Sequence, residues 1–244
     1  MKSVALIPAR YGSTRFPGKL LQMLGDKTII RHTYENTVLT HLFDEVIVIT
    51  DDQRIFNEII HNGGYAMMSK GEFESGSDRI ASVAERLDTE VVINVQGDEP
   101  FVNVQGLRSL LSVFDDEKVQ VASLMTPINE ESDILNPNYV KVVASCSGNA
   151  MYFSRAPIPF RRNQGSSVAY MKHIGIYGYR KDVLLQFPTL EKSPLETTEM
   201  LEQLRYLENG ISIRMVVTDE TPLSIDTPED LEKAKEFYKK WNHM

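Results

Sequence analysis

Residues 4–19, VALIPARYGSTRFPGK, join a short apolar run to a loop rich in glycine, proline, hydroxyl and basic residues. The apolar part, residues 4–7, has the composition of a buried strand. Similar runs follow at 45–50 (EVIVIT), 65–69 and 91–95 (VVINV), and helical patterns lie between them at roughly 28–39, 54–62 and 78–87. Apolar strands that alternate with helices predict a parallel sheet covered on both faces. The fold class predicted is α/β, with a doubly wound, mostly parallel sheet.

The pattern changes after residue 119. Strands are expected at 119–126, 140–146, 150–153 and 173–180, with few helices between them and an irregular basic segment at 155–167. We interpret the region around 120–190 as a smaller mixed-sheet extension that binds substrate or contacts a second copy of the chain. A strong helix is predicted over 195–209, ending at Gly210, then a strand at 212–218 and a last helix from Pro228 to about Trp241. We expect one α/β domain over residues 1–244.

The composition narrows the possible partners and the cellular location. The chain has 244 residues, 26 Lys and Arg against 34 Asp and Glu, and a net charge of -8. An acidic chain of this kind argues against broad nucleic-acid binding. No apolar run approaches the length of a membrane span or of a signal peptide core, so we expect a cytoplasmic protein. The single cysteine, Cys146, excludes an internal disulfide, and we expect a buried thiol there.

The loop after the first strand is a candidate phosphate site. It carries Arg10, Arg15 and Lys19 together with Gly12 and Gly18, at the carboxyl end of a predicted parallel strand. Ligands bind at this edge of doubly wound sheets, and glycines let backbone N–H groups approach an anion. The loop has neither the P-loop order nor the G-x-G-x-x-G order. Cations at this place predict a polyphosphate site.

Acidic residues follow another strand of the same predicted sheet. Gln96, Gly97, Asp98 and Glu99 come directly after residues 91–95, so Asp98 is expected near the first loop. By itself this segment could be a plain turn. Beside a polyphosphate, a carboxylate typically holds Mg²⁺, which prefers oxygen ligands. Asp226 precedes the last helix, and its spacing alone does not make it a second ligand.

Several other side chains allow both a structural and a functional interpretation. The small residues Ser75, Gly76 and Ser77 precede a helix and could also line a flat pocket for a base. In a strand, His173, Gly175 and Tyr177 share one face, which leaves space for a polar ligand. Glu199 and Gln203 stand four residues apart on the predicted helix 195–209 and would project together, on a face that could equally be solvated.

Taken in order, these segments resemble the 3-deoxy-manno-octulosonate (Kdo) cytidylyltransferase family. The resemblance rests on residues 7–19 and on six further segments: 94–100 (NVQGDEP), 136–143 (NPNYVKVV), 152–159 (YFSRAPIP), 173–180 (HIGIYGYR), 193–205 and 225–231 (IDTPEDL). It covers essentially the whole chain. It implies a nucleotide-diphospho-sugar transferase type of fold and a Mg²⁺-dependent reaction of CTP with Kdo that gives CMP-Kdo and pyrophosphate for lipopolysaccharide biosynthesis. A homodimer is also implied.

The resemblance further implies roles for individual residues. Arg10, Ser13 and Lys19 would hold the CTP phosphates, and Pro8, Ala9 and Ser75–Ser77 would surround the cytosine. Asp98 and Asp226 would bind Mg²⁺, and with Arg10 and Lys19 they would form the catalytic set. The sugar site would consist of Arg15, Gln96, Arg155, His173, Tyr177, Glu199 and Gln203.

Three alternatives remain at this stage. Another nucleotidyltransferase could use a different acidic sugar, such as 8-amino Kdo, or a different nucleotide. A glycosyltransferase also combines a nucleotide-binding sheet with a metal carboxylate, although the segment 96–98 lacks the usual D-x-D. A nucleotide-sensing module would bind CTP without turning it over.

Overall fold

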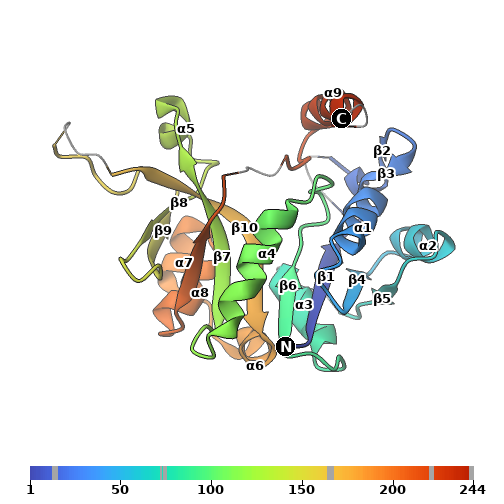
Figure 1. Ribbon diagram of the computed structural model, residues 1–244, viewed down its shortest axis with the longest axis horizontal. Helices are drawn as coiled ribbons and strands as arrows, with labels where there is room; N and C mark the ends of the chain where they lie inside the picture. The colour runs from blue at the N-terminus through green and yellow to red at the C-terminus, as the bar shows by residue number, and fades with distance from the viewer. Residues whose placement is uncertain (13–15, 72, 74–75, 164–167, 220–222, 242–244) are drawn as a thin grey trace. The chain divides into compact units, whose positions relative to one another are not determined.

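The structure is a computed structural model that describes all residues except 13–15, 72, 74–75, 164–167, 220–222 and 242–244 (Figure 1). The chain divides into two compact units. The first consists of Met1–Val104 and Pro222–Met244, and the second of Gln105–Thr221. The region 120–190, predicted as an extension, lies inside the second unit.

The sheet of the first unit is parallel, as predicted. Its strands are β1 (Ser3–Ala9), β4 (Glu45–Thr50), β5 (Ala66–Met68) and β6 (Val91–Asn94). β1 pairs with both β4 and β6, and β4 pairs with β5. The apolar side chains of β1 and β6 are almost completely buried, which agrees with strands covered on both faces.

The helices of the first unit begin at residues that can cap them. α1 (Ile29–Leu39) begins after Thr28, whose side chain accepts from the backbone N–H of Arg31, and α2 (Gln53–His61) begins after Asp52, which accepts from that of Arg54. α1 and α2 pack against β4, and α3 (Gly76–Ala84) packs against β1. A short 3-10 helix, Lys19–Leu21, and a small hairpin of β2 (Met23–Leu24) and β3 (Lys27–Thr28) precede α1.

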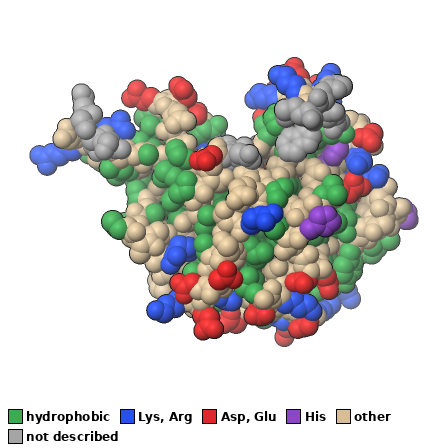
Figure 2. Space-filling view, viewed as in Figure 1, with side chains coloured by type: hydrophobic (Ala, Val, Ile, Leu, Met, Phe, Trp, Pro, Cys, Tyr) green, Lys and Arg blue, Asp and Glu red, His purple; other side chains and the backbone are tan. Residues whose placement is uncertain are grey.

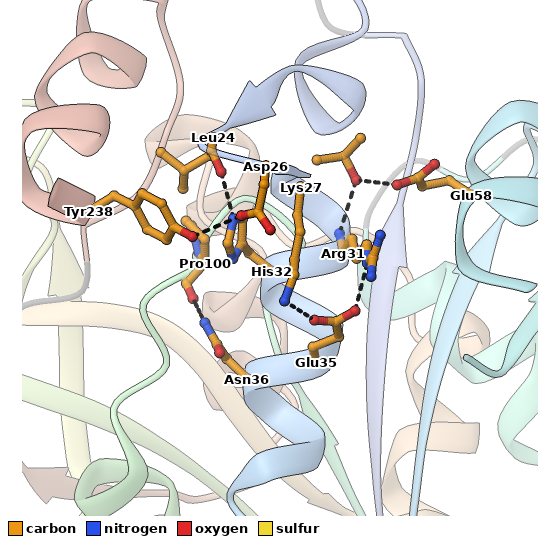
Figure 3. Close-up of polar contacts among 11 residues, drawn as sticks. Leu24, Asp26, Lys27, Arg31, His32, Glu35, Asn36, Glu58, Pro100 and Tyr238 are labelled. Atoms are coloured by element: carbon orange, nitrogen blue, oxygen red, sulfur yellow. Dashed lines mark hydrogen bonds and ion pairs between the residues drawn. The ribbon is translucent and has the colours of Figure 1, made fainter. Parts of the chain in front are cut away.

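The last helix, α9 (Pro228–Trp241), is anchored on the hairpin and α1 (Figure 3). The Tyr238 hydroxyl donates to Asp26 at 3.0 Å, and the Tyr238 ring meets the His32 ring edge-on at 5.0 Å. His32 Nε2 lies 2.6 Å from the Leu24 carbonyl, so this nitrogen carries the proton. Gly25, with φ +69°, makes room for the tyrosine, because a Cβ there would lie 2.3 Å from Tyr238 Cε1. The same view shows Lys27 and Arg31 donating to Glu35.

The second unit contains the predicted mixed sheet. Its strands are β7 (Val121–Ile128), β8 (Lys141–Ala144), β9 (Ala150–Ser154), β10 (Tyr170–Arg180) and β11 (Ile213–Val217). β7 is parallel to β11 and antiparallel to β10, and β8 is antiparallel to both β10 and β9. Its helices are α4 (Val104–Ser112), which begins at the boundary, α5 (Glu131–Leu135), α6 (Lys181–Gln186), α7 (Pro194–Glu199) and α8 (Gln203–Glu208).

The prediction of one helix over 195–209 is wrong. α7 ends at Glu199, Met200 adopts a left-handed conformation with φ 54°, and α8 begins only at Gln203. A buried ion pair joins the two short helices: Arg205 donates to both Glu196 oxygens at 2.7 and 2.6 Å. Glu199 and Gln203 therefore do not share one helix face. The predicted end at Gly210 is confirmed, with φ +76° after α8.

Three observations describe the surface. Cys146 is exposed, not buried, because it lies in the turn between β8 and β9. On the face drawn in Figure 2, basic and acidic side chains are interspersed. Among the residues that the structure describes, no helix is long and apolar enough to cross a membrane.

Candidate active site

The predicted phosphate loop leaves β1 at its carboxyl end. Pro8 and Ala9 are the last residues of β1, and Arg10 is exposed immediately after them. The base of the loop is closed by a hydrogen bond from the Gly18 N–H to the Tyr11 carbonyl at 3.1 Å. Gly18 has φ +67°, which favours glycine, and Lys19 follows it. Ser13 and Arg15, which the sequence assigned to phosphate and sugar, lie outside the described residues.

Lys19 meets two carboxylates that are far from it in the sequence. Its ammonium donates to Asp98 and, at 3.0 Å, to Asp226. The Lys19 side chain is only 13% exposed. Burial disfavours its charged form, but the hydrogen bonds and charges of Asp98 and Asp226 outweigh this effect and raise the pKa of Lys19. The structure thus brings together three of the four residues predicted to be catalytic.

Backbone contacts hold the two aspartates in place. The Ile225 N–H donates to the Asp98 carbonyl at 3.0 Å, which joins the segment before α9 to the loop after β6. Thr33 Oγ1 on α1 donates to the Gly97 carbonyl at 3.0 Å, and a Cβ on Gly97 would lie 3.0 Å from the Pro8 carbonyl oxygen. At the start of α9, Asp230 accepts from the Thr227 N–H and donates its own N–H to Thr227, so Thr227 caps this helix as predicted.

The aspartate pair fits a magnesium ion. Asp98 and Asp226 already surround one cationic group, the Lys19 ammonium, and they supply oxygen donors only. No cluster of three or more His, Cys, Asp or Glu suited to a metal occurs among the described residues. Mg²⁺ is commonly held by one or two carboxylates together with substrate phosphates, so a pair is sufficient.

The predicted base loop lies against the end of β1. Gly76 and Ser77 are the first residues of α3, and a Cβ on Gly76 would lie 3.4 Å from Pro8 Cγ. Ser75 lies outside the described residues. The buried amide of Asn94, the last residue of β6, is also close to Gly76, and its Oδ1 has no hydrogen-bond partner in the described part of the chain. Such groups commonly mark ligand or water sites, but no sequence signal separates Asn94 from an ordinary strand end.

His173 and Tyr177 are neighbours on β10 in the second unit. A bulge between Ile174 and Tyr177 interrupts the pairing with β7, yet the two rings lie 5.3 Å apart. Apart from its two chain neighbours, no heavy atom of the described residues lies within 4 Å of the position that a Cβ on Gly175 would occupy. His173 Nε2 lies 2.9 Å from Ser123 Oγ on β7. Burial lowers the pKa of His173 to about 3, so its ring is neutral at physiological pH.

A second group in this unit surrounds Glu199. Its carboxylate accepts from Ser154 Oγ at 2.5 Å and from the Arg155 N–H at 3.0 Å. The Arg155 side chain donates to the backbone carbonyls of Glu199, Pro137 and Met200. Gln203 is buried, and its Nε2 has no partner within the described ranges of the chain. Ser123 and Ser154, which orient predicted residues, were missed because an isolated serine in an apolar strand carries no sequence signal.

The predicted residues therefore occupy two separate units. Those assigned to phosphate, base and metal belong to the first unit, and so does Gln96, which was assigned to the sugar. Arg155, His173, Tyr177, Glu199 and Gln203 belong to the second. A parallel sheet whose first strand leads into a basic loop, with paired carboxylates at the same edge, is typical of nucleotide-binding α/β enzymes such as nucleotidyltransferases.

Comparisons with known proteins agree with this class. A family model described as Cytidylyltransferase matches residues 4–213. A 3-deoxy-manno-octulosonate cytidylyltransferase of Flavobacterium johnsoniae is 55% identical over 96% of this chain and 98% of its own, and one of Christiangramia forsetii is 51% identical over 96% of each. The chain belongs to the 3-deoxy-manno-octulosonate cytidylyltransferase family. A solved CMP:2-keto-3-deoxy-manno-octonic acid synthetase complexed with CTP is 40% identical over 99% of this chain and 100% of its own, with a TM-score of 0.95.

Proposed function

We propose that this protein transfers the cytidylyl group of CTP to the anomeric hydroxyl of Kdo and releases pyrophosphate. The product, CMP-Kdo, would supply Kdo for lipopolysaccharide biosynthesis. The family membership over nearly the full length supports the two substrates. The observation in the structure that carries the proposal is the meeting of Lys19 with Asp98 and Asp226 at the carboxyl end of β1 and β6.

The first unit would bind and orient the nucleotide. Arg10 directly follows β1 and Lys19 follows the loop, and both would neutralise the phosphates, with Ser13 of the same loop as a further donor. Pro8, Ala9, Gly76 and Ser77 would enclose the base. Phosphoryl transfer depends mainly on positioning and charge neutralisation, so these groups would stabilise the leaving pyrophosphate without forming a covalent intermediate.

The two aspartates would hold Mg²⁺. When bound there, the ion would neutralise phosphate charge and make the α-phosphorus more electrophilic. Asp98 and Asp226 would contribute their carboxylate oxygens, and the Lys19 ammonium, which now lies between them, would move to a phosphate oxygen.

The second unit would bind the sugar. His173 is neutral and Tyr177 keeps its proton, because burial raises the pKa of Tyr177 well above its usual value. Both side chains can therefore exchange uncharged hydrogen bonds with sugar hydroxyls. The Glu199 carboxylate is an acceptor, and the buried amide of Gln203 has a donor without a hydrogen-bond partner among the described residues. Arg15 and Gln96 of the first unit remain proposed sugar residues, with Arg15 as the partner of the Kdo carboxylate.

We also propose that the enzyme works as a homodimer in the cytoplasm. The family resemblance implies the dimer, and the second unit exposes large apolar side chains that a second copy could cover, including Leu135, Met151 and Phe160. CTP is a cytoplasmic metabolite, which supports the location. Light scattering on the purified protein tests the dimer, since a mass near that of one chain would contradict it.

Pyrophosphate release from CTP, Kdo and Mg²⁺ tests the reaction. We expect release only when all three are present, and we expect Asp98→Asn to lower kcat by roughly 10²-fold or more, as removal of other electrostatic stabilisers does. Asp88→Asn is the matched control, because Asp88 is a fully exposed aspartate of the same unit that forms a surface ion pair with Lys2. Near wild-type turnover by Asp98→Asn would contradict the metal assignment. CTP binding without release would indicate another acceptor sugar or a module that binds without chemistry.

A further inference from the structure

Lys141 is a buried cation to which the proposed mechanism gives no role. It opens β8 within the segment NPNYVKVV, and its side chain is fully buried, with a relative exposure of 0%. Its ammonium donates to the Asn136 carbonyl at 3.0 Å and to the Arg155 carbonyl at 2.5 Å. A lysine is rarely buried completely, because its ammonium loses hydration. Burial and the nearby Arg155 charge accordingly lower the pKa of Lys141.

Arg155 joins the same segments to the end of α7. Its Nε donates to the Glu199 carbonyl at 2.9 Å, and its two terminal nitrogens donate to the carbonyls of Pro137 at 3.0 Å and Met200 at 3.4 Å. Lys141 holds the backbone on both sides of this contact, at Asn136 and at Arg155 itself. Two cations thus tie three segments together: the loop before β8, the residue after β9 and the end of α7.

The side chain at the centre of these segments is the Glu199 carboxylate. One oxygen accepts from Ser154 Oγ and the other from the Arg155 N–H, so its position depends on the end of β9. Met200, the next residue, has φ 54°, an unfavourable conformation for methionine, and its carbonyl accepts from Arg155. The contacts of Lys141 and Arg155 therefore stabilise the backbone before β8. They also stabilise Met200, the strained residue beside Glu199.

We propose that Lys141 and Arg155 act as a cationic clasp that positions Glu199 to accept hydrogen bonds from hydroxyls of the sugar substrate. Lys141 is a positioning residue: it acts through the backbone of Arg155 and does not touch the substrate. This inference rests on the proposed function, and it adds that the affinity for the sugar depends on a lysine buried in β8. The binding of CTP does not depend on it, because the residues assigned to CTP belong to the first unit.

The test is Lys141→Met, which keeps most of the side-chain volume and removes the charge. We expect KM for Kdo to rise about tenfold or more, since a lost hydrogen bond from a charged donor typically has that effect. KM for CTP, and the affinity for CTP measured by calorimetry without Kdo, should stay within about twofold, as for independent sites. Lys118→Met is the control, because Lys118 is an exposed lysine of the same unit.

The outcomes separate the clasp from a general structural role. Unchanged KM values, or KM values for Kdo and CTP that rise by the same factor, would overturn the proposal. If Lys141→Met does not fold, Lys141→Gln decides: its amide can still donate to one of the two carbonyls but carries no charge, so a smaller rise in KM for Kdo, again without a change in KM for CTP, is expected. The wild-type reaction is measured first. If the wild type shows no Kdo-dependent turnover, the proposed function is contradicted. If the wild type is active but the variants change KM for Kdo and CTP equally, only the clasp is contradicted.

Discussion

Replacing Arg205 by methionine should lower the stability of the second unit more than any substitution of a surface charge does. Arg205 and Glu196 are 6% and 7% exposed, and two short hydrogen bonds join them across α7 and α8. Arg205 also lies over the Phe187 ring at 4.3 Å. Removing one member leaves the Glu196 carboxylate buried without its cation, which costs about 3–5 kcal/mol. In a chain of this size that corresponds to a fall of roughly 10 °C in the unfolding midpoint.

Thermal unfolding followed by circular dichroism measures this loss. The matched control is Lys235→Met, because Lys235 forms a comparable ion pair with Glu232 on the exposed side of α9. Such surface pairs contribute about 1 kcal/mol or less. The double variant Glu196→Leu with Arg205→Met should recover much of the loss, since it leaves no buried charge. An Arg205→Met midpoint equal to that of the Lys235→Met control would refute the argument that this pair holds the two helices together.

Three further predictions concern other contacts. In the absence of nucleotide, Lys19→Met should bind Mn²⁺ about tenfold more tightly than the wild type, because the ion no longer has to displace an ammonium from Asp98 and Asp226. Calorimetry measures this affinity, and weaker binding by the variant would contradict the reasoning. His173 has a pKa of about 3, so the unfolded chain takes up a proton below about pH 6.5 that the folded chain refuses, and stability should fall by about 1.4 kcal/mol per pH unit towards pH 3. Urea unfolding at pH 7 and pH 5 should show a smaller fall for His173→Gln, and an equal fall would argue against this origin. Gly25→Ala should destabilise the protein by about 1–3 kcal/mol more than Gly63→Ala, because both have positive φ but only Gly25 lies against Tyr238; equal losses would mean that the ring moves freely.

Much of the first unit could be predicted because its signals are local. The run EVIVIT is apolar on both faces and is bounded by aspartates, and β4 begins and ends where the sequence indicates. The approach of Asp98 to the first loop follows from the rule that parallel strands share their carboxyl edge. Asp226 could not be placed in this way, because 127 other residues separate it from Asp98 and only the folded chain brings Ile225 to the Asp98 carbonyl.

The errors arise where contacts between distant residues override local preference. The segment 195–209 has no glycine or proline after Pro194 and is a good helix former by composition, yet the chain breaks at Met200. The pair of Glu196 with Arg205 and the hydrogen bonds from Arg155 stabilise that break, and neither is visible in a local pattern. Lys141 resembles any charged residue at a strand end, so its complete burial could not be predicted. Cys146 was expected to be buried from its residue type alone, but it lies in an exposed turn.

The first unit is built from both ends of the chain, and this affects the order in which the protein can be completed during synthesis. Residues up to Val104 leave the ribosome before the whole second unit, and α9 leaves after it. Domains generally fold from the amino terminus as they emerge. Here the parallel sheet can form early, but α9 and Asp226 can reach it only after the whole second unit has been synthesised. A prematurely terminated chain would carry Asp98 and Lys19 without the second carboxylate, so incomplete products would lack the aspartate pair proposed to hold the metal.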